Sequence, residues 1–290
     1  LIFTLPNFIL AGELKGLLEE NFGERYYGVY VEDYKLGYVV NKLSQNKDEV
    51  VADFSMNLRL PAGLAKAEVE GAKYTLSQTI TQHKFEKKTG LLSQQSETHG
   101  EKFYLDYNDL LEDRSFKQKI WIRNAKYRGD YIYEVVDTSG DESKVSSYKL
   151  PSVNMVDHFA EINFVHSDPM VGDVRNIEVS GLDFKGGVYS SLILTLEQKF
   201  KLDTVDEEYH YLVKLELDNG DVSRLKVDQY GNLIEGDLLG LRVIREPKDQ
   251  ALKLDEKISR TSYRRPSRLD KFPQRPVPYC FLYNSNLILE

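Results

Sequence analysis

The chain has 290 residues, enough for one large or two small domains, and hydrophobic residues make up 41% of it. Its charged fraction of 29% excludes an integral membrane protein and a wholly disordered chain, and its net charge of −8 argues against general nucleic-acid binding. Tyrosine, with 19 copies, favours strands, so the composition indicates a β protein.

The N-terminus begins with an apolar stretch. Residues 1–11, LIFTLPNFILA, turn polar at Gly12. This pattern is typical of the end of a signal-peptide apolar region with a cut near Ala11, and the stretch is too short to span a bilayer. We therefore expect a periplasmic or secreted protein whose domain starts at residue 12. A short apolar strand, or a start of the sequence unrelated to export, are the alternatives.

The first half of the domain predicts mostly strands. Leucines at three- and four-residue spacing predict a short helix over 13–21, which Gly23 ends. Alternation over 50–60 places Phe54, Met56, Leu58 and Leu60 on one face of a strand, and alternation over 72–85 places Tyr74, Leu76 and Ile80 on one side. The other predicted strands are 26–31, 35–43, 91–104, 117–127 and 130–137, with a polar loop or helical turn at 107–114 and a mobile loop at 138–147.

The second half predicts one helix and further strands. Pro151 suits a first helical turn, and apolar residues at near-helical spacing extend the helix to Phe164. Asn219-Gly220 supplies the backbone angles of a two-residue hairpin turn. The predicted strands are 174–184, 188–202, 209–217, 222–227, 232–235 and 241–246.

This pattern predicts a mainly β fold over residues 12–252. It favours a strongly curved antiparallel sheet or a partly closed β-barrel with one or two short helices. A division into two β halves near residue 147 is an alternative. Prolines predict that residues 253–290 are a Pro/Arg-rich linker and tail.

The tail is strongly basic. Residues 257–275 carry seven basic side chains and one acid, a net charge of +6, so the rest of the chain carries −14. A solvated linker beside an acidic body explains such a run, and contact with anionic lipid or nucleic acid is the minor alternative.

No catalytic or metal-binding constellation stands out in the sequence. Cys280, the one cysteine, lies near the chain end with no segment left to build a site around it. None of the histidines lies within four residues of another histidine or of Cys280, although His83 and His99 face each other if their strands pair as a hairpin. Residues 203–208 lack calcium-loop spacing. We expect no cofactor and no metal; the remaining histidines are His158, His166 and His210.

Tyrosines crowd the first hairpin and give the only candidate binding residues. A tyrosine combines a large apolar area with a polar tip, as binding surfaces require. Ordinary strand packing with the hydroxyl at the rim is the alternative. The candidates are Tyr26, Tyr30, Tyr34 and Tyr38.

Three stretches together resemble a known family. They are YYGVYVEDYKLGY at 26–38, VGD at 171–173, and VDQYGNLI at 227–234 followed by LGLRVIRE at 239–246. In this order they are similar to the exported β domain that precedes the catalytic domain of bacterial transglutaminase-like proteins, or to a related stand-alone exported domain. The resemblance covers residues 22–252. It implies a non-catalytic domain followed by a Pro-rich linker, with the catalytic Cys, His and Asp beyond that linker, so Cys280 does not inherit the nucleophile role.

Three hypotheses follow. The first is a non-catalytic exported accessory domain that binds a protein partner. The second is a periplasmic carrier of lipid or another apolar ligand in a half-open barrel, which requires a continuous apolar cavity of several hundred Å³, the usual size of ligand pockets. The third is an enzyme, alone or completed by a partner, which requires a histidine beside Cys280 or beside a carboxylate pair.

Overall fold

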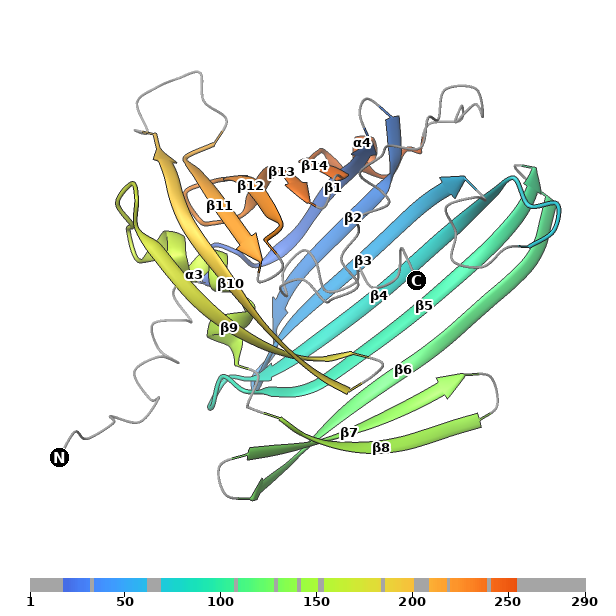
Figure 1. Cartoon of the computed structure of the whole chain (residues 1–290), viewed down its shortest axis with the longest axis horizontal. Helices are drawn as coiled ribbons and strands as arrows, with labels where there is room; N and C mark the ends of the chain where they lie inside the picture. The colour runs from blue at the N-terminus through green and yellow to red at the C-terminus, as the bar shows by residue number, and fades with distance from the viewer. Residues whose placement is uncertain are drawn as a thin grey trace.

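In the computed structural model, the described residues form fourteen antiparallel strands in one strongly curved sheet (Figure 1). The structure describes residues 18–31, 34–61, 69–106, 109–127, 130–139, 142–150, 154–183, 186–200, 209–217, 220–238 and 241–254. The strands are β1 (Gly23–Val31), β2 (Tyr34–Gln45), β3 (Glu49–Pro61), β4 (Tyr74–Glu86), β5 (Leu92–Asp106), β6 (Asp109–Tyr127), β7 (Asp130–Ser139), β8 (Glu142–Leu150), β9 (Val174–Asp183), β10 (Gly186–Lys199), β11 (Tyr211–Leu217), β12 (Val222–Val227), β13 (Leu233–Leu238) and β14 (Leu241–Arg245).

The strands follow one another around the sheet as a meander. Consecutive strands pair with each other, except for β8 and β9, and β1 also pairs with β14, so the described chain enters and leaves the sheet in its middle. Among the described strands, β8 and β9 form the two edges, and the sheet does not close between them. The predicted fold class, a mainly β fold built on a strongly curved antiparallel sheet, is confirmed, and the described chain has three short helices where one or two were expected.

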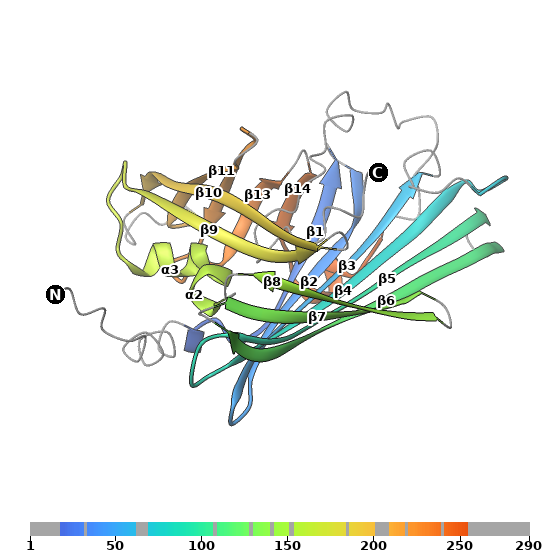
Figure 2. The same ribbon diagram turned by 60° about the horizontal axis from the view of Figure 1, so that its bottom comes forward.

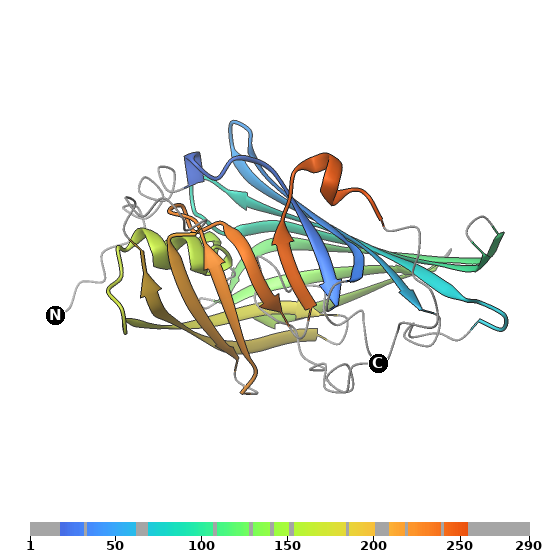
Figure 3. The same cartoon turned by 90° about the horizontal axis from the view of Figure 1, so that it is seen from above.

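Three short helices accompany the sheet in the described chain. α2 (Met155–His158) and α3 (Ala160–His166) connect the two edge strands and lie at one end of the sheet, away from the far ends of β4, β5 and β6 (Figure 2). α4 (Lys248–Ala251) follows β14 and packs against β1 and β2 on the outside of the sheet (Figure 3). No described helix has the length and apolar character needed to cross a bilayer.

The main core lies on the concave face of the sheet, where α2 and α3 also pack. Met56, Leu58 and Leu60 are buried there, as the alternation of β3 predicts, and Phe54 packs against this core. Buried apolar side chains of other strands extend this core across more than half of the sheet. They include Tyr27, Val29, Val39, Leu43, Leu192, Leu194, Leu196, Val213, Leu215, Leu225, Val227 and Val243.

The concave face changes character at β4. Register pairs Met56 with Thr79, Leu58 with Ser77 and Leu60 with Thr75, and directly opposite residues share a face. The buried side chains of β4 are therefore mostly hydroxyls, while Leu76 and Ile80 lie on the outer face. We call these inward hydroxyls the polar stripe: Thr75, Ser77, Thr79 and Thr81.

Two predicted loops are strands. The prediction of a loop or helical turn at 107–114 is wrong, because β6 starts at Asp109 and its backbone pairs with β5 beyond the apolar core; residues 107–108 lie outside the described chain. The prediction of a mobile loop at 138–147 is also wrong for its described residues, while residues 140–141 lie outside the description. Its first residues belong to β7, and β8 starts at Glu142 as an edge strand, where polar side chains are well tolerated.

The helix prediction over 151–164 holds in part. The described portion is helical but breaks at Phe159 into α2 and α3, and residues 151–153 lie outside the description. α4 was not predicted, because four residues are too few to show a helical period. Of the helix expected over 13–21, residues 18–19 are helical and 13–17 lie outside the described chain, as do residues 1–11, Cys280 and residues 255–290.

Candidate functional site

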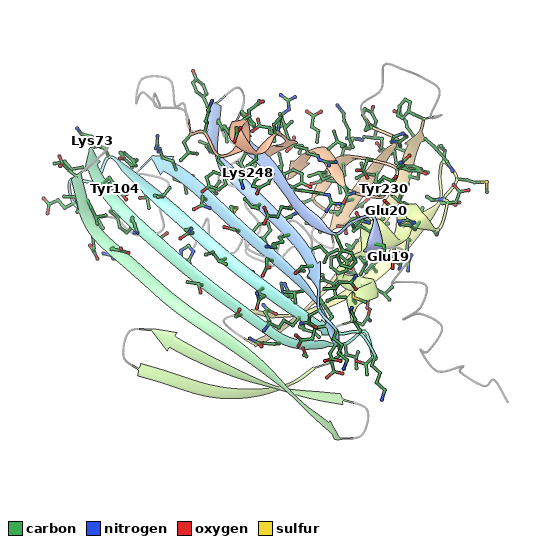
Figure 4. All side chains as sticks on the ribbon, turned by 180° about the vertical axis from the view of Figure 1, so that it is seen from behind. Glu19, Glu20, Lys73, Tyr104, Tyr230 and Lys248 are labelled. Carbon is green, nitrogen blue, oxygen red and sulfur yellow. The ribbon has the colours of Figure 1, made fainter. Side chains whose placement is uncertain are left out.

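The predicted tyrosines lie on the first hairpin but not in one shared site. Tyr26 and Tyr30 lie on the face of β1 opposite the buried Tyr27 and Val29. The Tyr26 hydroxyl donates to the Glu24 carboxylate, and Lys248 lies 5.3 Å from the centre of the Tyr26 ring. Figure 4 shows Lys248 on α4. This packing joins the hairpin to α4.

Tyr30 takes part in a buried polar network behind the hairpin. Its hydroxyl donates to Glu246 Oε1, while Lys35 Nζ lies 2.6 Å from Glu246 Oε2 and donates to the Gln250 carbonyl oxygen at 2.7 Å. A buried ion pair of this kind persists only when further hydrogen bonds compensate for lost hydration, and here they do. The network fixes α4 to the outer face of the sheet.

The other two tyrosines lie apart from that network. Tyr38 is half-buried opposite Gly28, and burial raises the pKa of its phenol. Tyr34 is exposed at the hairpin end, opposite Val31. A binding role for the four tyrosines stays a prediction.

The histidines are arranged differently from the sequence expectation. His83 pairs with Gln95 and His99 with Thr79, so the two histidines do not face each other across the β4–β5 hairpin. His83 instead meets His158 of α2, with ring centres 4.7 Å apart. Within the described chain, no three of the metal-binding residue types come close enough to hold an ion.

A small cavity lies where α2 and α3 meet the concave face. Its volume is about 90 Å³. Its lining mixes apolar walls with polar groups: Asn21, Arg25, Tyr27, Asn41, Lys42, Leu43, Ala52, Asp53, Phe54, His83, His158, Phe159, Glu161, Ile162, Leu225, Val227, Gly231, Asn232 and Leu233. A broader depression of about 840 Å³ between the β2–β3 and β4–β5 turns is lined by charged surface residues such as Lys47 and Glu86, as solvated turns are.

The floor of the cavity is a row of side chains across three strands. Register pairs Arg25 with Asn41 and Asn41 with Phe54, so all three share the concave face. Arg25 donates from Nη1 to the Asn21 carbonyl oxygen at 2.6 Å and from Nη2 to the Glu20 carbonyl oxygen at 3.3 Å. Burial lowers the pKa of Arg25, although a guanidinium stays charged at neutral pH. The floor therefore presents a cation beside a neutral amide.

The roof is formed by α2 and α3. The Asn154 side chain caps α2 by accepting from the Asp157 amide at 2.9 Å, and the Met155 amide donates to the Gly90 carbonyl oxygen at 2.7 Å. The His158 ring then packs 4.8 Å from Phe85 and 4.7 Å from Phe159. A cap, a backbone contact and a ring cluster thus fix the roof to β4.

Burial keeps His83 of β4 and His158 of α2 neutral. It lowers the pKa of His83 from 6.5 to about 3 and lowers that of His158 well below 6.5, with the neighbouring His83 adding to the effect on His158. At neutral pH both rings are therefore uncharged packing groups.

The side wall is a tight turn between β12 and β13. Asp228 accepts from the amides of Tyr230 and Asn232, both at 2.9 Å, which closes the turn. Gly231 has φ of +79°, and a Cβ there would lie 2.7 Å from the Ile162 Cα, so only glycine lets the turn approach α3 this closely. Asn21 donates to the Tyr230 carbonyl oxygen at 3.3 Å, and Figure 4 shows Tyr230 near Glu20.

The two histidines of the cavity, His83 and His158, contact aromatic rings and each other. An apolar cavity with a few converging polar groups is typical of a ligand site. Strand alternation and the turn glycine are sequence signals for its individual walls, but no sequence signal brings these walls together.

Comparison with known proteins adds little. No protein-family model and no curated protein matches this chain. The crystal structure of a β-barrel-like protein from Brucella abortus, of a domain of unknown function (DUF1849), matches with a TM-score of 0.46 and 8% identity, over 77% of this chain and 93% of that chain. This likeness assigns no function to the chain.

Proposed function

We propose that this protein is a non-catalytic binding domain whose ligand site is the cavity between the helices α2 and α3 and the strands β1, β2 and β3. The single observation that carries the proposal is the cavity itself. It combines apolar walls from Phe54, Phe159 and Leu225 with a guanidinium and an amide from neighbouring strands. Such a mixture orients a mostly apolar ligand through a few polar contacts.

Size limits what this site holds. Pockets for drug-sized ligands are about 300–1,000 Å³, whereas this cavity is about 90 Å³. It suits a compact molecule or one end of a larger one. A carrier of whole lipids, the second candidate, therefore finds less support in the described residues. Lipid co-purifying in native mass spectrometry would favour the carrier instead.

Filling the cavity tests the proposal. Ala52→Leu adds bulk to the lining, and Ser55→Leu on the same strand adds similar bulk to the opposite face. We expect at least one of isobutyramide, methyl isobutyrate and isobutyrate to bind in ligand-observed NMR. The signal should disappear in Ala52→Leu and persist in Ser55→Leu. Equal binding by both variants, or no binding of any probe to the wild type, would contradict the proposed site.

Export and attachment to a larger protein belong to the same proposal. The apolar residues 1–11 and the motif order at 26–38, 171–173 and 227–246 support them. Cell fractionation of the gene product tests export, and the reading frame beyond Glu290 tests for a catalytic segment. Hydrolase or acyl-transfer activity of the isolated chain would contradict the non-catalytic role.

A further inference from the structure

Among the described residues, two polar atoms of the cavity floor have no hydrogen-bond partner. In the part of the chain that the structure describes, Arg25 Nε and Asn41 Oδ1 are buried and make no hydrogen bond. The two residues face each other across β1 and β2, and both line the cavity. One is a donor and the other an acceptor, and leaving such groups unsatisfied away from water costs free energy.

The two atoms narrow the group that would satisfy them to one that offers both an acceptor and a donor. Arg25 Nε needs an acceptor, and Asn41 Oδ1 needs a donor. A carboxylate offers no donor, and it would also meet the buried carboxylate of Glu161 in the same lining. An ester offers only acceptors, and a hydrocarbon offers neither. A neutral amide carries a carbonyl oxygen for the guanidinium and an N–H for the asparagine.

The rest of the lining agrees with a short acyl chain. The walls beside the floor are Leu43, Phe54, Phe159 and Leu225, which suit methyl or methylene groups. A cavity of about 90 Å³ is smaller than the roughly 150 Å³ cavity that holds benzene, so the amide must be a small terminal group.

We infer that the cavity recognises a neutral amide group with a short apolar substituent, at the end of a larger molecule. This inference rests on the proposed function and names its ligand class. Two sources share the chemistry: an amide side chain of a peptide, and an acetamido group of an N-acetylated sugar.

Three probes of the same carbon skeleton test the inference. We expect isobutyramide to bind with a millimolar dissociation constant, and methyl isobutyrate and isobutyrate to bind at least about tenfold more weakly, because neither satisfies both floor atoms. Titration followed by backbone amide chemical shifts measures all three. Perturbed shifts should centre on residues 25 and 41 and on α3. Glutamine and N-acetylglucosamine then distinguish the two sources.

A matched pair of variants separates recognition from folding. Asn41→Leu keeps the size of the side chain and removes the acceptor, so it should abolish the preference for amide over ester while leaving the protein folded. Asn57→Leu makes the same change on β3, at a position that does not line the cavity, and should leave the preference unchanged.

The outcomes distinguish this inference from the proposed function. Equal binding of the three probes would overturn the amide preference and leave the binding site standing. Stronger binding of isobutyrate would overturn the preference in favour of an anion. Failure of every probe to bind would overturn both, because the cavity would then hold water only. Retention of amide preference in Asn41→Leu would also overturn the inference.

Discussion

The described part of the concave face divides into two halves that differ in polarity: the leucine half, which includes β10, and the half that begins with the polar stripe of β4. On β10, Leu192, Leu194 and Leu196 are fully buried, as the hydrophobic effect requires. On β4, Thr75 and Thr79 are only 1% exposed, although Leu76 and Ile80 alternate with them and lie on the outer face. The comparison teaches that position in a curved sheet, and not the polarity of the strand's own residues, decides which face becomes the interior.

The halves should therefore be stabilised differently. The leucine half gains free energy from apolar burial. The polar stripe buries little apolar area and depends on hydrogen bonds such as that between Thr79 Oγ1 and His99 Nδ1, at 3.1 Å. Buried hydroxyls cost free energy when unpaired, so each has to be assessed by its own partner.

The largest effect is expected in the leucine half. Leu194→Ala removes buried methyl groups from a fully buried site and leaves a cavity, so we expect a loss of about 2–5 kcal/mol in the free energy of unfolding. Urea denaturation followed by circular dichroism measures it. A loss below about 1 kcal/mol would mean that the apolar half is not the main source of stability.

The second effect concerns the boundary between the halves, where His83 and His158 pack together. Both folded-state pKa values are lowered by burial, that of His83 to about 3. As pH falls below about 6.5, the unfolded chain takes up protons that the folded chain excludes, so stability falls from about pH 6.5 towards pH 3. The expected slope is about 1.4 kcal/mol per pH unit for each histidine.

Denaturation at pH 7, 6 and 5 measures this slope. His83→Gln removes one of the two titrating groups. The slope of the free energy of unfolding against pH should therefore decrease by the contribution of one histidine. A variant with the same pH slope as the wild type would show that His83 is hydrated, and so not buried against α2 as described.

The sequence predicted the strands well because their period of two survives in both halves. In β3 it also identified the inner face, since Met56, Leu58 and Leu60 are large and apolar. In β4 the same rule favours the wrong face, because Tyr74, Leu76 and Ile80 are the apolar set and face outward. Alternation defines the two faces of a strand, but it does not say which of them will lie on the concave side of the curved sheet.

The candidate site was harder to predict than the strands. His83 meets His158 from 75 positions away, and Gly231 meets Ile162 of α3; both contacts depend on how the helices enter the concave face. Even the neighbours Arg25 and Asn41 depend on a shift in register between Val29 and Tyr30. These are consequences of packing and of a bulge, which no local period encodes.

A smaller effect is expected within the polar stripe, and it differs from one threonine to the next. Thr79→Val keeps the shape and removes the hydroxyl bonded to His99, so we expect a loss of about 1 kcal/mol. Thr75→Val is the matched control. Thr75 Oγ1 is buried without a hydrogen-bond partner in the described chain, so valine there should be neutral or stabilising. Equal losses at both positions would mean that packing, and not the hydrogen bond, determines the cost.

The smallest effect should come from the apolar side chains that β4 turns outward. Ile80 is 42% exposed, and Ile80→Thr keeps a β-branched residue in the strand, so the expected loss is about 0.5 kcal/mol or less. The same urea denaturation measures it beside Leu194→Ala.

A loss comparable to that of Leu194→Ala would mean that another molecule covers the outer face in solution. In that case the loss should shrink as the protein is diluted, because the free energy of a self-associating surface depends on concentration. A small, concentration-independent loss would instead leave the outer face of β4 as solvent-facing surface and the polar stripe as the true interior of that strand.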